Sequence, residues 1–124
     1  MSTRHANLTL FIALLAAASR AAAGGDADHG RSLYLTQCAA CHSMDYNGVG
    51  PAHKGVFGRK AGTAQNYSYS EALKRSEIVW SEKTLDQWLS SPEGFVPGQK
   101  MGLSVPDAKD RADLIAYLKK AGSQ

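Results

Sequence analysis

Cys38-Ala39-Ala40-Cys41-His42 is the stretch of this 124-residue chain that says most about its fold. The pattern C-x-x-C-H is the attachment sequence of a c-type haem. In such a site both thiols bond covalently to the haem, and the adjacent imidazole binds the iron. One helical turn over these residues brings the two sulfurs to the same side while His42 faces the metal. We therefore predict one covalently bound haem c, with the iron held by His42.

Two cysteines at this spacing also occur in three kinds of site without haem. A thioredoxin-like redox pair needs a βαβ context, and no strongly β-rich run surrounds this one. A tetrahedral zinc site needs four ligands, so with only two cysteines in the chain it would require two distant histidines. A structural disulfide is plausible in an exported protein. The histidine that directly follows the second cysteine favours haem.

Residues 1–23 have the composition of a secretory signal peptide. Arg4 provides a positive start, residues 8–18 are apolar except for one threonine, and three alanines precede Gly24. A membrane anchor is the alternative, but a span needs about 20 apolar residues, and this run is about half as long. We expect cleavage close to Gly24. Since bacterial c-type haem attachment takes place outside the cytoplasm, we expect a periplasmic protein.

Size and charge limit what the mature chain can be. The full chain has 14 Lys and Arg against 11 Asp and Glu, a net charge of +3; without Arg4 and Arg20 the balance is 12 to 11. Two ionised haem propionates would bring the net charge to about −1. There is no clustered basic stripe of the kind that binds nucleic acid. Residues 24–124 are enough for a single domain, and we expect the haem-free chain to be poorly folded.

Helix-start residues and apolar spacing predict an all-α domain. Ser70, Ser81 and Asp107 are candidate N-caps, and Pro92 is expected to end the helix that Ser81 begins. The segment from Gly48 to Gly62 holds five glycines and one proline, so it is predicted to be an ordered loop. The expected helices cover Asp28 to about Ala39, residues 70–75, residues 81–89 and residues 107–122.

A methionine is the expected second ligand of the iron. Met1 is removed with the signal peptide, and Met44 lies too close to His42 in sequence to reach the opposite side. Met101 remains, three residues after Gly98 of a Pro97-Gly98 pair that suits a tight turn. A thioether ligand raises the reduction potential relative to a second histidine.

His29 and His53 are the alternatives for the second ligand. His29 is expected to be a solvated residue at a helix start, and His53 lies in the glycine-rich loop. With both axial positions filled by side chains, no coordination site is open to a substrate. This argues for an electron carrier and against an oxygenase or peroxidase.

From Gly30 to Gly122 the chain resembles a class I cytochrome c, similar to mitochondrial and soluble bacterial members. The order and spacing of the matching segments make the resemblance specific. They are Gly30-x-x-Leu33-Tyr34, Cys38 to His42, Gly50-Pro51, Gly55 to Lys60, Tyr67 to Ser70, Trp80, Pro97 to Met101 and Arg111 to Lys120.

The resemblance implies a cytochrome c fold, with a few helices around one haem and crossing N- and C-terminal helices. It makes His42 and Met101 the axial ligands and gives the Pro51 carbonyl the role of orienting the His42 ring. It further implies that a buried propionate is held by Arg59, Tyr69 and Trp80. Gly30 and Tyr34 should meet Leu114 and Tyr117 where the terminal helices cross.

Some positions depart from the family pattern. Trp88 stands where mitochondrial members have a tyrosine beside the methionine sulfur, and His53 stands where a leucine commonly packs. Gln37, Glu93 and Gly94 occupy positions that carry lysines around the exposed haem edge of those members. We therefore expect docking with weak electrostatic steering.

The functional expectation is a soluble periplasmic one-electron carrier of a respiratory chain, not an enzyme. Its partners would be redox proteins such as an oxidase, dehydrogenase or reductase, met as a monomer or in a transient complex without stable membrane insertion. A cytochrome subunit that accepts electrons from a periplasmic dehydrogenase, such as one for sulfite or alcohol oxidation, is the alternative. A haem sensor or peroxidase that frees the sixth coordination position is a further one.

Overall fold

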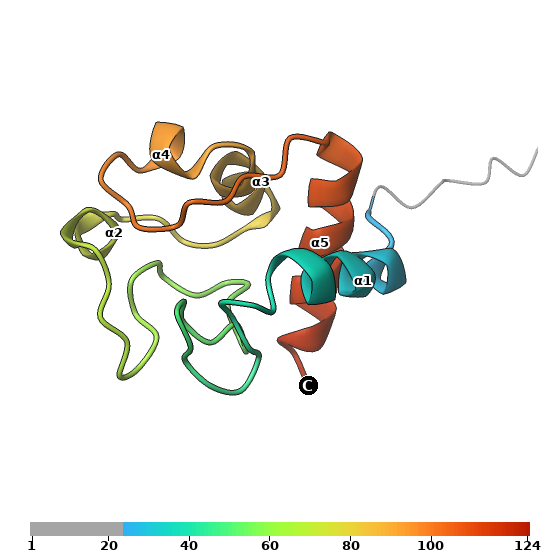
Figure 1. Cartoon of the computed structure of the whole chain (residues 1–124), viewed down its shortest axis with the longest axis horizontal. Helices are drawn as coiled ribbons and strands as arrows, with labels where there is room; N and C mark the ends of the chain where they lie inside the picture. The colour runs from blue at the N-terminus through green and yellow to red at the C-terminus, as the bar shows by residue number, and fades with distance from the viewer. Residues whose placement is uncertain (1–23) are drawn as a thin grey trace, which may run out of the picture.

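The computed structural model describes residues 24–124, which form helices joined by long loops (Figure 1). Within this range there is no strand, and one isolated β-bridge joins Lys60 and Val79. No helix in it is long and apolar enough to cross a membrane. The all-α prediction is confirmed, while the predicted signal peptide lies outside the described residues. The helices are α1 (Ala27–Gln37), α2 (Glu71–Arg75), α3 (Glu82–Ser90), α4 (Pro92–Phe95) and α5 (Ala108–Ala121).

Side-chain caps begin α2, α3 and α5 where the sequence predicted them. The Ser70 hydroxyl and the Asp107 carboxylate each accept a backbone N–H from the first turn of their helix. Ser81 accepts the N–H of Thr84, and the Thr84 hydroxyl in turn accepts the N–H of Ser81. Each bond satisfies an N–H group that has no partner within its helix. The caps therefore fix the points at which the long loops end.

Two helix boundaries differ from the prediction. The first helix is capped by Asp26, whose carboxylate accepts two backbone N–H bonds, and so it starts before Asp28. Pro92 was expected only to end the preceding helix, but it is the first residue of α4, which Ser91 caps. Proline is favoured at this position because a first-turn N–H has no helical acceptor.

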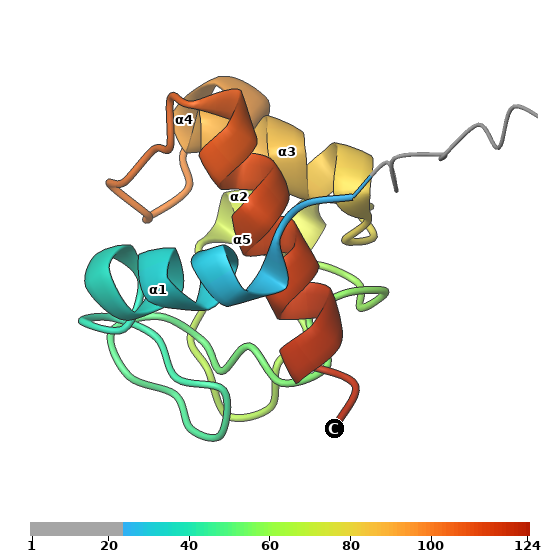
Figure 2. The ribbon, with the colours of Figure 1, turned by 90° about the vertical axis from the view of Figure 1, so that its right-hand side faces the viewer.

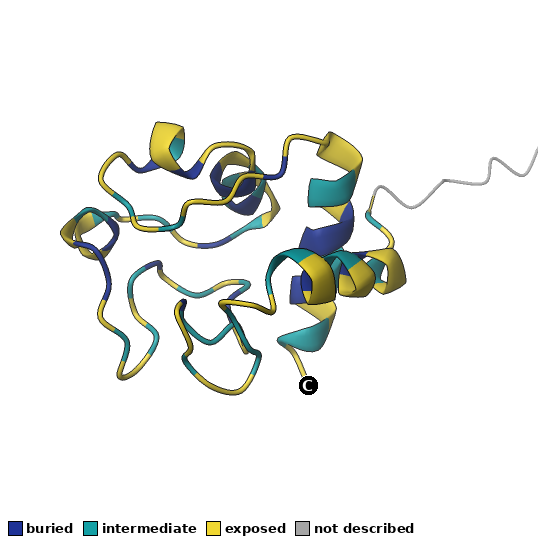
Figure 3. Cartoon of the chain, viewed as in Figure 1, coloured by how far each residue is buried: buried dark blue, intermediate teal, exposed yellow. Residues whose placement is uncertain are grey.

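The terminal helices α1 and α5 cross in close contact, as the resemblance implied (Figure 2). Gly30 is buried at the crossing, and a side chain there would overlap the backbone carbonyl of Asp113. The ring centroids of Tyr34 and Tyr117 lie 5.2 Å apart. Figure 3 shows buried residues on the inward sides of α3 and α5. Those of α5 include the predicted apolar set, Leu114, Ile115 and Leu118.

A buried carboxylate ties α1 to α5. Asp113 is 1% exposed and accepts bonds from the Lys109 ammonium (2.6 Å), the His29 Nδ1–H (2.7 Å) and the Asp26 backbone N–H (2.7 Å). The bond from Lys109 above all, and then that from His29, holds the pKa of Asp113 well below its ordinary value. His29 lies at the start of a helix, as expected, but it is bonded to this carboxylate and not merely solvated.

We expect Asp113→Asn to lower the free energy of unfolding at pH 7 by about 1–3 kcal/mol, because charge-assisted hydrogen bonds are lost. A carboxylate whose pKa is lower in the folded than in the unfolded chain stabilises the fold. This stabilisation is complete above the pKa of the unfolded chain, about 3.9. This contribution is lost as the pH falls through the lower folded value. The deficit of the variant should therefore shrink below about pH 4, as measured by guanidinium unfolding of the haem-loaded protein.

Asp45→Asn is the matched control, because Asp45 is exposed and its side chain makes no hydrogen bond within residues 24–124. It removes the same charge without touching the helix crossing, so its stability should follow wild type at each pH. A deficit of Asp113→Asn that stays constant down to pH 2 would show that the ionised carboxylate is not the source.

Candidate functional site

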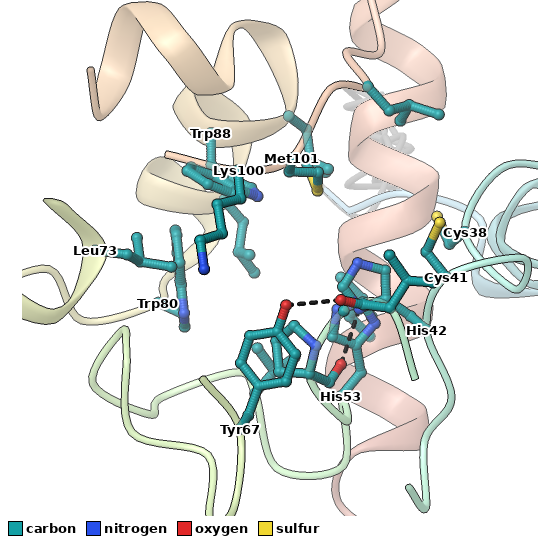
Figure 4. A pocket seen from close by; sticks show the side chains of 18 of the residues that line it. Cys38, Cys41, His42, His53, Tyr67, Leu73, Trp80, Trp88, Lys100 and Met101 are labelled. Atoms are coloured by element: carbon teal, nitrogen blue, oxygen red, sulfur yellow. Dashed lines mark hydrogen bonds between the residues drawn. The ribbon is translucent and has the colours of Figure 1, made fainter. Parts of the chain in front are cut away.

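A cavity of about 520 Å³ lies in the middle of the molecule (Figure 4). Its walls come from α1, α3, α5 and the loops on either side of α2, and most of its lining is apolar. The structure brings every site residue predicted from the sequence to this one cavity. These residues are Cys38, Cys41, His42, Pro51, Arg59, Tyr69, Trp80, Trp88 and Met101.

The two thiols lie in a turn that directly follows α1. The backbone N–H groups of Cys41 and His42 both bond to the Cys38 carbonyl, at 3.1 and 2.9 Å, which keeps the motif coiled after the helix has ended. Both cysteines are free thiols. Cys38 is partly buried, and this burial, together with the nearby Cys41, raises the pKa of Cys38 to about 11. Both cysteines line the cavity.

His42 is held by its ring on the adjacent wall. Its Nδ1–H donates a hydrogen bond of 2.8 Å to the Pro51 carbonyl. The lone pair of Nε2 is therefore free to bind a metal. Burial lowers the pKa of His42, and the bond to Pro51 offsets part of this effect. The ring is consequently neutral at pH 7, the form in which imidazole binds metals. Gly50 has no room for a side chain, because a Cβ there would collide with the His42 ring.

Met101 reaches the cavity from the loop between α4 and α5. A turn precedes it, in which the N–H of Gln99 bonds to the Val96 carbonyl at 3.1 Å and Gly98 has a φ of +88°. This confirms the predicted Pro97-Gly98 turn, since proline suits its second position and glycine its third. The Met101 sulfur points into the cavity from the side opposite His42 (Figure 4).

Neither alternative histidine faces His42 across the cavity. The ring of His53 stacks on His42 itself, with centroids 4.0 Å apart and planes 18° apart. His29 is bonded to Asp113 at the helix crossing. Of the three candidates, Met101 alone is placed opposite His42.

The three side chains predicted to hold a propionate line the same cavity, and two of them already make hydrogen bonds to the backbone. The Arg59 guanidinium donates to the backbone carbonyls of Ala52 (3.0 Å) and Lys54 (3.1 Å). The Tyr69 hydroxyl accepts the backbone N–H of Ala64 at 3.0 Å. Trp80 is buried, with its ring centroid 5.5 Å from that of Trp88. The hydroxyl hydrogen of Tyr69 and the remaining N–H groups of Arg59 are still available to a carboxylate.

His53 is the residue whose place the sequence did not reveal. Besides its stack on His42, its Nδ1 shares a hydrogen bond of 3.0 Å with the Tyr34 hydroxyl. Burial, with smaller effects of His42 and Arg59, lowers its pKa to about 3, so the ring is neutral. One feature of the sequence pointed to this contact. His53 comes two residues after Pro51, whose carbonyl was expected to bond to the His42 ring.

The donor set fits a c-type haem. Two thiols in a single turn are available for the covalent bonds, a neutral imidazole has one free nitrogen, and a thioether lies opposite. The apolar walls suit a large flat apolar body.

Comparison with known proteins gives a consistent answer. The family model described as cytochrome c matches residues 27–122. Cytochrome c of Gibberella zeae is 46% identical over 101 residues, covering 78% of this chain and 95% of the relative. Cytochrome c of Euglena viridis is 43% identical over 98 residues, covering 77% and 96%.

A solved structure agrees with these relatives. Cytochrome cH from Methylobacterium extorquens superposes with a TM-score of 0.75 at 47% identity, covering 77% of this chain and 99% of that one. The chain described here belongs to the cytochrome c family and carries a covalently bound c-type haem.

Proposed function

We propose that this cytochrome c, an electron carrier by family, shuttles single electrons between periplasmic redox proteins and catalyses no bond change itself. The observation that carries the proposal is the meeting of two thiols, a free imidazole nitrogen and a thioether in one apolar cavity. Haem supplies the ferric/ferrous couple when bound.

His42 and Met101 are proposed as the two axial ligands, and Pro51 as the residue that orients His42. Because both ligands are side chains of the chain, no position is open to oxygen or peroxide. The soft, neutral thioether favours the reduced state. Trp88, buried on α3, excludes water from the cavity and contributes an apolar wall to it.

Arg59, Tyr69 and Trp80 are proposed to stabilise a buried propionate. An unpaired carboxylate in an apolar site is costly, and these residues offer one cation and two neutral donors. The Arg59 bonds to two loop carbonyls would hold the guanidinium in place for this contact.

The chain is proposed to be exported to the periplasm. Residues 1–23 supply the signal, and residues 24–124 form the single exported domain. Partners are proposed to be an oxidase, dehydrogenase or reductase of a respiratory chain, bound transiently by the monomer.

The face around the exposed Cys41 is proposed as the place where these partners dock. Val49 is 77% exposed and Leu103 is 36% exposed, and both line the mouth of the cavity. Glu93, which stands where mitochondrial members carry a lysine, is exposed on α4 and accepts the Gly98 backbone N–H. A face of this composition attracts partners through apolar contact more than through charge.

We expect one electron per chain to pass from the reduced protein to ferricyanide, with a second-order rate that changes less than about threefold between roughly 0.01 and 0.3 M salt. The physical reason is that Gln37, Glu93 and Gly94 stand where mitochondrial members carry lysines, so fewer positive charges attract the anion. Stopped-flow absorbance measures both the rate and the stoichiometry.

Val49→Lys and Val79→Lys form a matched pair for this measurement. Both add one charge at an exposed valine, but only Val49 lines the cavity mouth. Val49→Lys should raise the low-salt rate and make the rate fall as salt is added, whereas Val79→Lys should have a smaller effect on both. A steep fall in wild type would contradict the docking proposal, and a transfer other than one electron per chain would contradict the proposed function.

A further inference from the structure

The backbone around His53 is fixed on every side. Its N–H donates to the Ser43 carbonyl (2.8 Å), and its carbonyl accepts the N–H of Val56 (2.9 Å). The Arg59 guanidinium bonds to the carbonyls of the residues directly before and after His53, at 3.0 and 3.1 Å. The loop therefore presents this side chain from a constrained position.

The His53 ring is also oriented through its own atoms. Its Nδ1 lies 3.0 Å from the Tyr34 hydroxyl, and the two rings meet edge to face with centroids 5.6 Å apart. Burial raises the pKa of Tyr34 above its ordinary value, so the hydroxyl keeps its proton. Tyr34 is itself packed against Tyr117 of α5. A chain of contacts thus leads from the helix crossing to the His53 ring.

The far end of this chain of contacts is the His42 imidazole. The two histidine rings are nearly parallel, 18° apart, with centroids separated by 4.0 Å. The Pro51 carbonyl fixes the edge of His42 at 2.8 Å, and His53 covers one of its faces. Together these two contacts restrict rotation of the His42 ring about its bond to Cβ.

We propose that His53 is a positioning residue for electron transfer, which sets the plane of the His42 imidazole and lowers the reduction potential of the metal that His42 binds. The proposal rests on the proposed role of His42 as an axial ligand. The resemblance supplies no such role, because it places an ordinary apolar leucine at this position.

The sign of the effect follows from charge. Oxidation adds one positive charge to the metal centre, and an apolar environment disfavours the more highly charged state. A neutral imidazole carries a dipole and a polarisable ring, and it lies directly against the ligand that shares this charge. Polarity and hydrogen bonding around a ligand are among the means by which a protein tunes a haem potential. His53 therefore favours the oxidised state more than a leucine would.

The test is His53→Leu in the haem-loaded protein, with the reduction potential measured by spectroelectrochemical titration. The equilibrium constant for reduction should increase threefold to tenfold, which corresponds to a rise of about 28–59 mV at 59 mV per tenfold change. Proton NMR of the oxidised form should show altered shifts of the haem methyl groups, because these depend on the plane of the axial imidazole. The optical spectrum should keep the features of sulfur ligation.

Two further variants separate the role of His53 from general packing. His29→Leu makes the same substitution at an imidazole that bonds to Asp113 at the helix crossing, so it should lower stability and leave potential and methyl shifts unchanged. Tyr34→Phe removes the hydroxyl that orients His53 and keeps the ring. It should alter the methyl shifts, and it serves as the second test if His53→Leu does not take up haem.

The results that overturn the proposal differ from those that overturn the proposed function. The role of His53 would be refuted if the equilibrium constant for reduction of His53→Leu were less than twice that of wild type. This corresponds to a potential less than about 18 mV above wild type, at 59 mV per tenfold change, or to a potential below it. Unchanged methyl shifts in both His53→Leu and Tyr34→Phe would do the same. Absence of haem or of sulfur ligation in the wild-type protein would instead refute the axial-ligand proposal.

Discussion

A Cys38→Ala/Cys41→Ala chain is expected to be colourless and largely unfolded. Without the thiols no covalent bond to haem can form, and the cavity of about 520 Å³ would have to collapse or fill with water. At about 24 cal/mol per Å³, keeping it empty would cost on the order of 10 kcal/mol. This is comparable to the whole stability of a small domain, about 5–15 kcal/mol. Absorption spectra and thermal unfolding followed by circular dichroism measure both effects.

The control for this variant is the unchanged sequence produced without a haem-attachment system. It keeps both cysteines and should be as poorly folded as the double variant, because the missing haem and not the missing thiols is the cause. A sharp cooperative melt of either chain, at the temperature of the haem-loaded protein, would refute the idea that the haem completes the core.

Met101→Ala is expected to keep its haem and most of its fold but to lose its closed coordination. Removing the thioether opens the sixth position, so the reduced protein should bind carbon monoxide at neutral pH. The weak sulfur-to-iron band of the oxidised protein should disappear. The potential should fall by roughly 0.1 V or more, within the span of about 0.8 V that axial ligands cover. Absorption spectra and redox titration measure all three.

Met44→Ala is the matched control, because it removes the same side chain from the segment next to His42. Met44 packs against the core, and its backbone carbonyl accepts the Lys54 N–H at 3.0 Å. Its loss should lower stability and leave ligation and carbon monoxide binding unchanged. If Met101→Ala kept the spectrum of wild type, another residue would have to be the ligand.

The sequence predicted the parts of the fold that depend on local interactions. Ser70, Ser81 and Asp107 were identified as caps because each bonds within its own first helical turn. The cap of α4 is equally local, and Ser91-Pro92-Glu93 is a recognisable helix start, although Pro92 was expected only as a stop. A proline after a helix can mark the end of that helix or begin the next one, and here it does both, since α3 ends at Ser90 and α4 begins at Pro92.

Long-range pairs could not be predicted in the same way. His29 bonds to Asp113 across 84 positions, and no periodicity in the chain connects them. His53 meets His42 because its backbone N–H bonds to the Ser43 carbonyl, which brings the loop back over the motif. Such contacts follow from the path of the loops, which neither propensity nor apolar spacing specifies. The Pro51 contact was anticipated only through the resemblance to a known family.

The crossing of α1 and α5 has a consequence for how the chain acquires its structure. The first and last helices of the domain are partners, so their contacts join residues as far apart as Asp26 and Asp113. Contacts of such large sequence separation slow the folding rate. A chain emerging from its N-terminus towards its C-terminus cannot complete this domain until its final turns have appeared. Cys38 to His42, directly after α1, therefore remain accessible while the polypeptide is still incompletely folded.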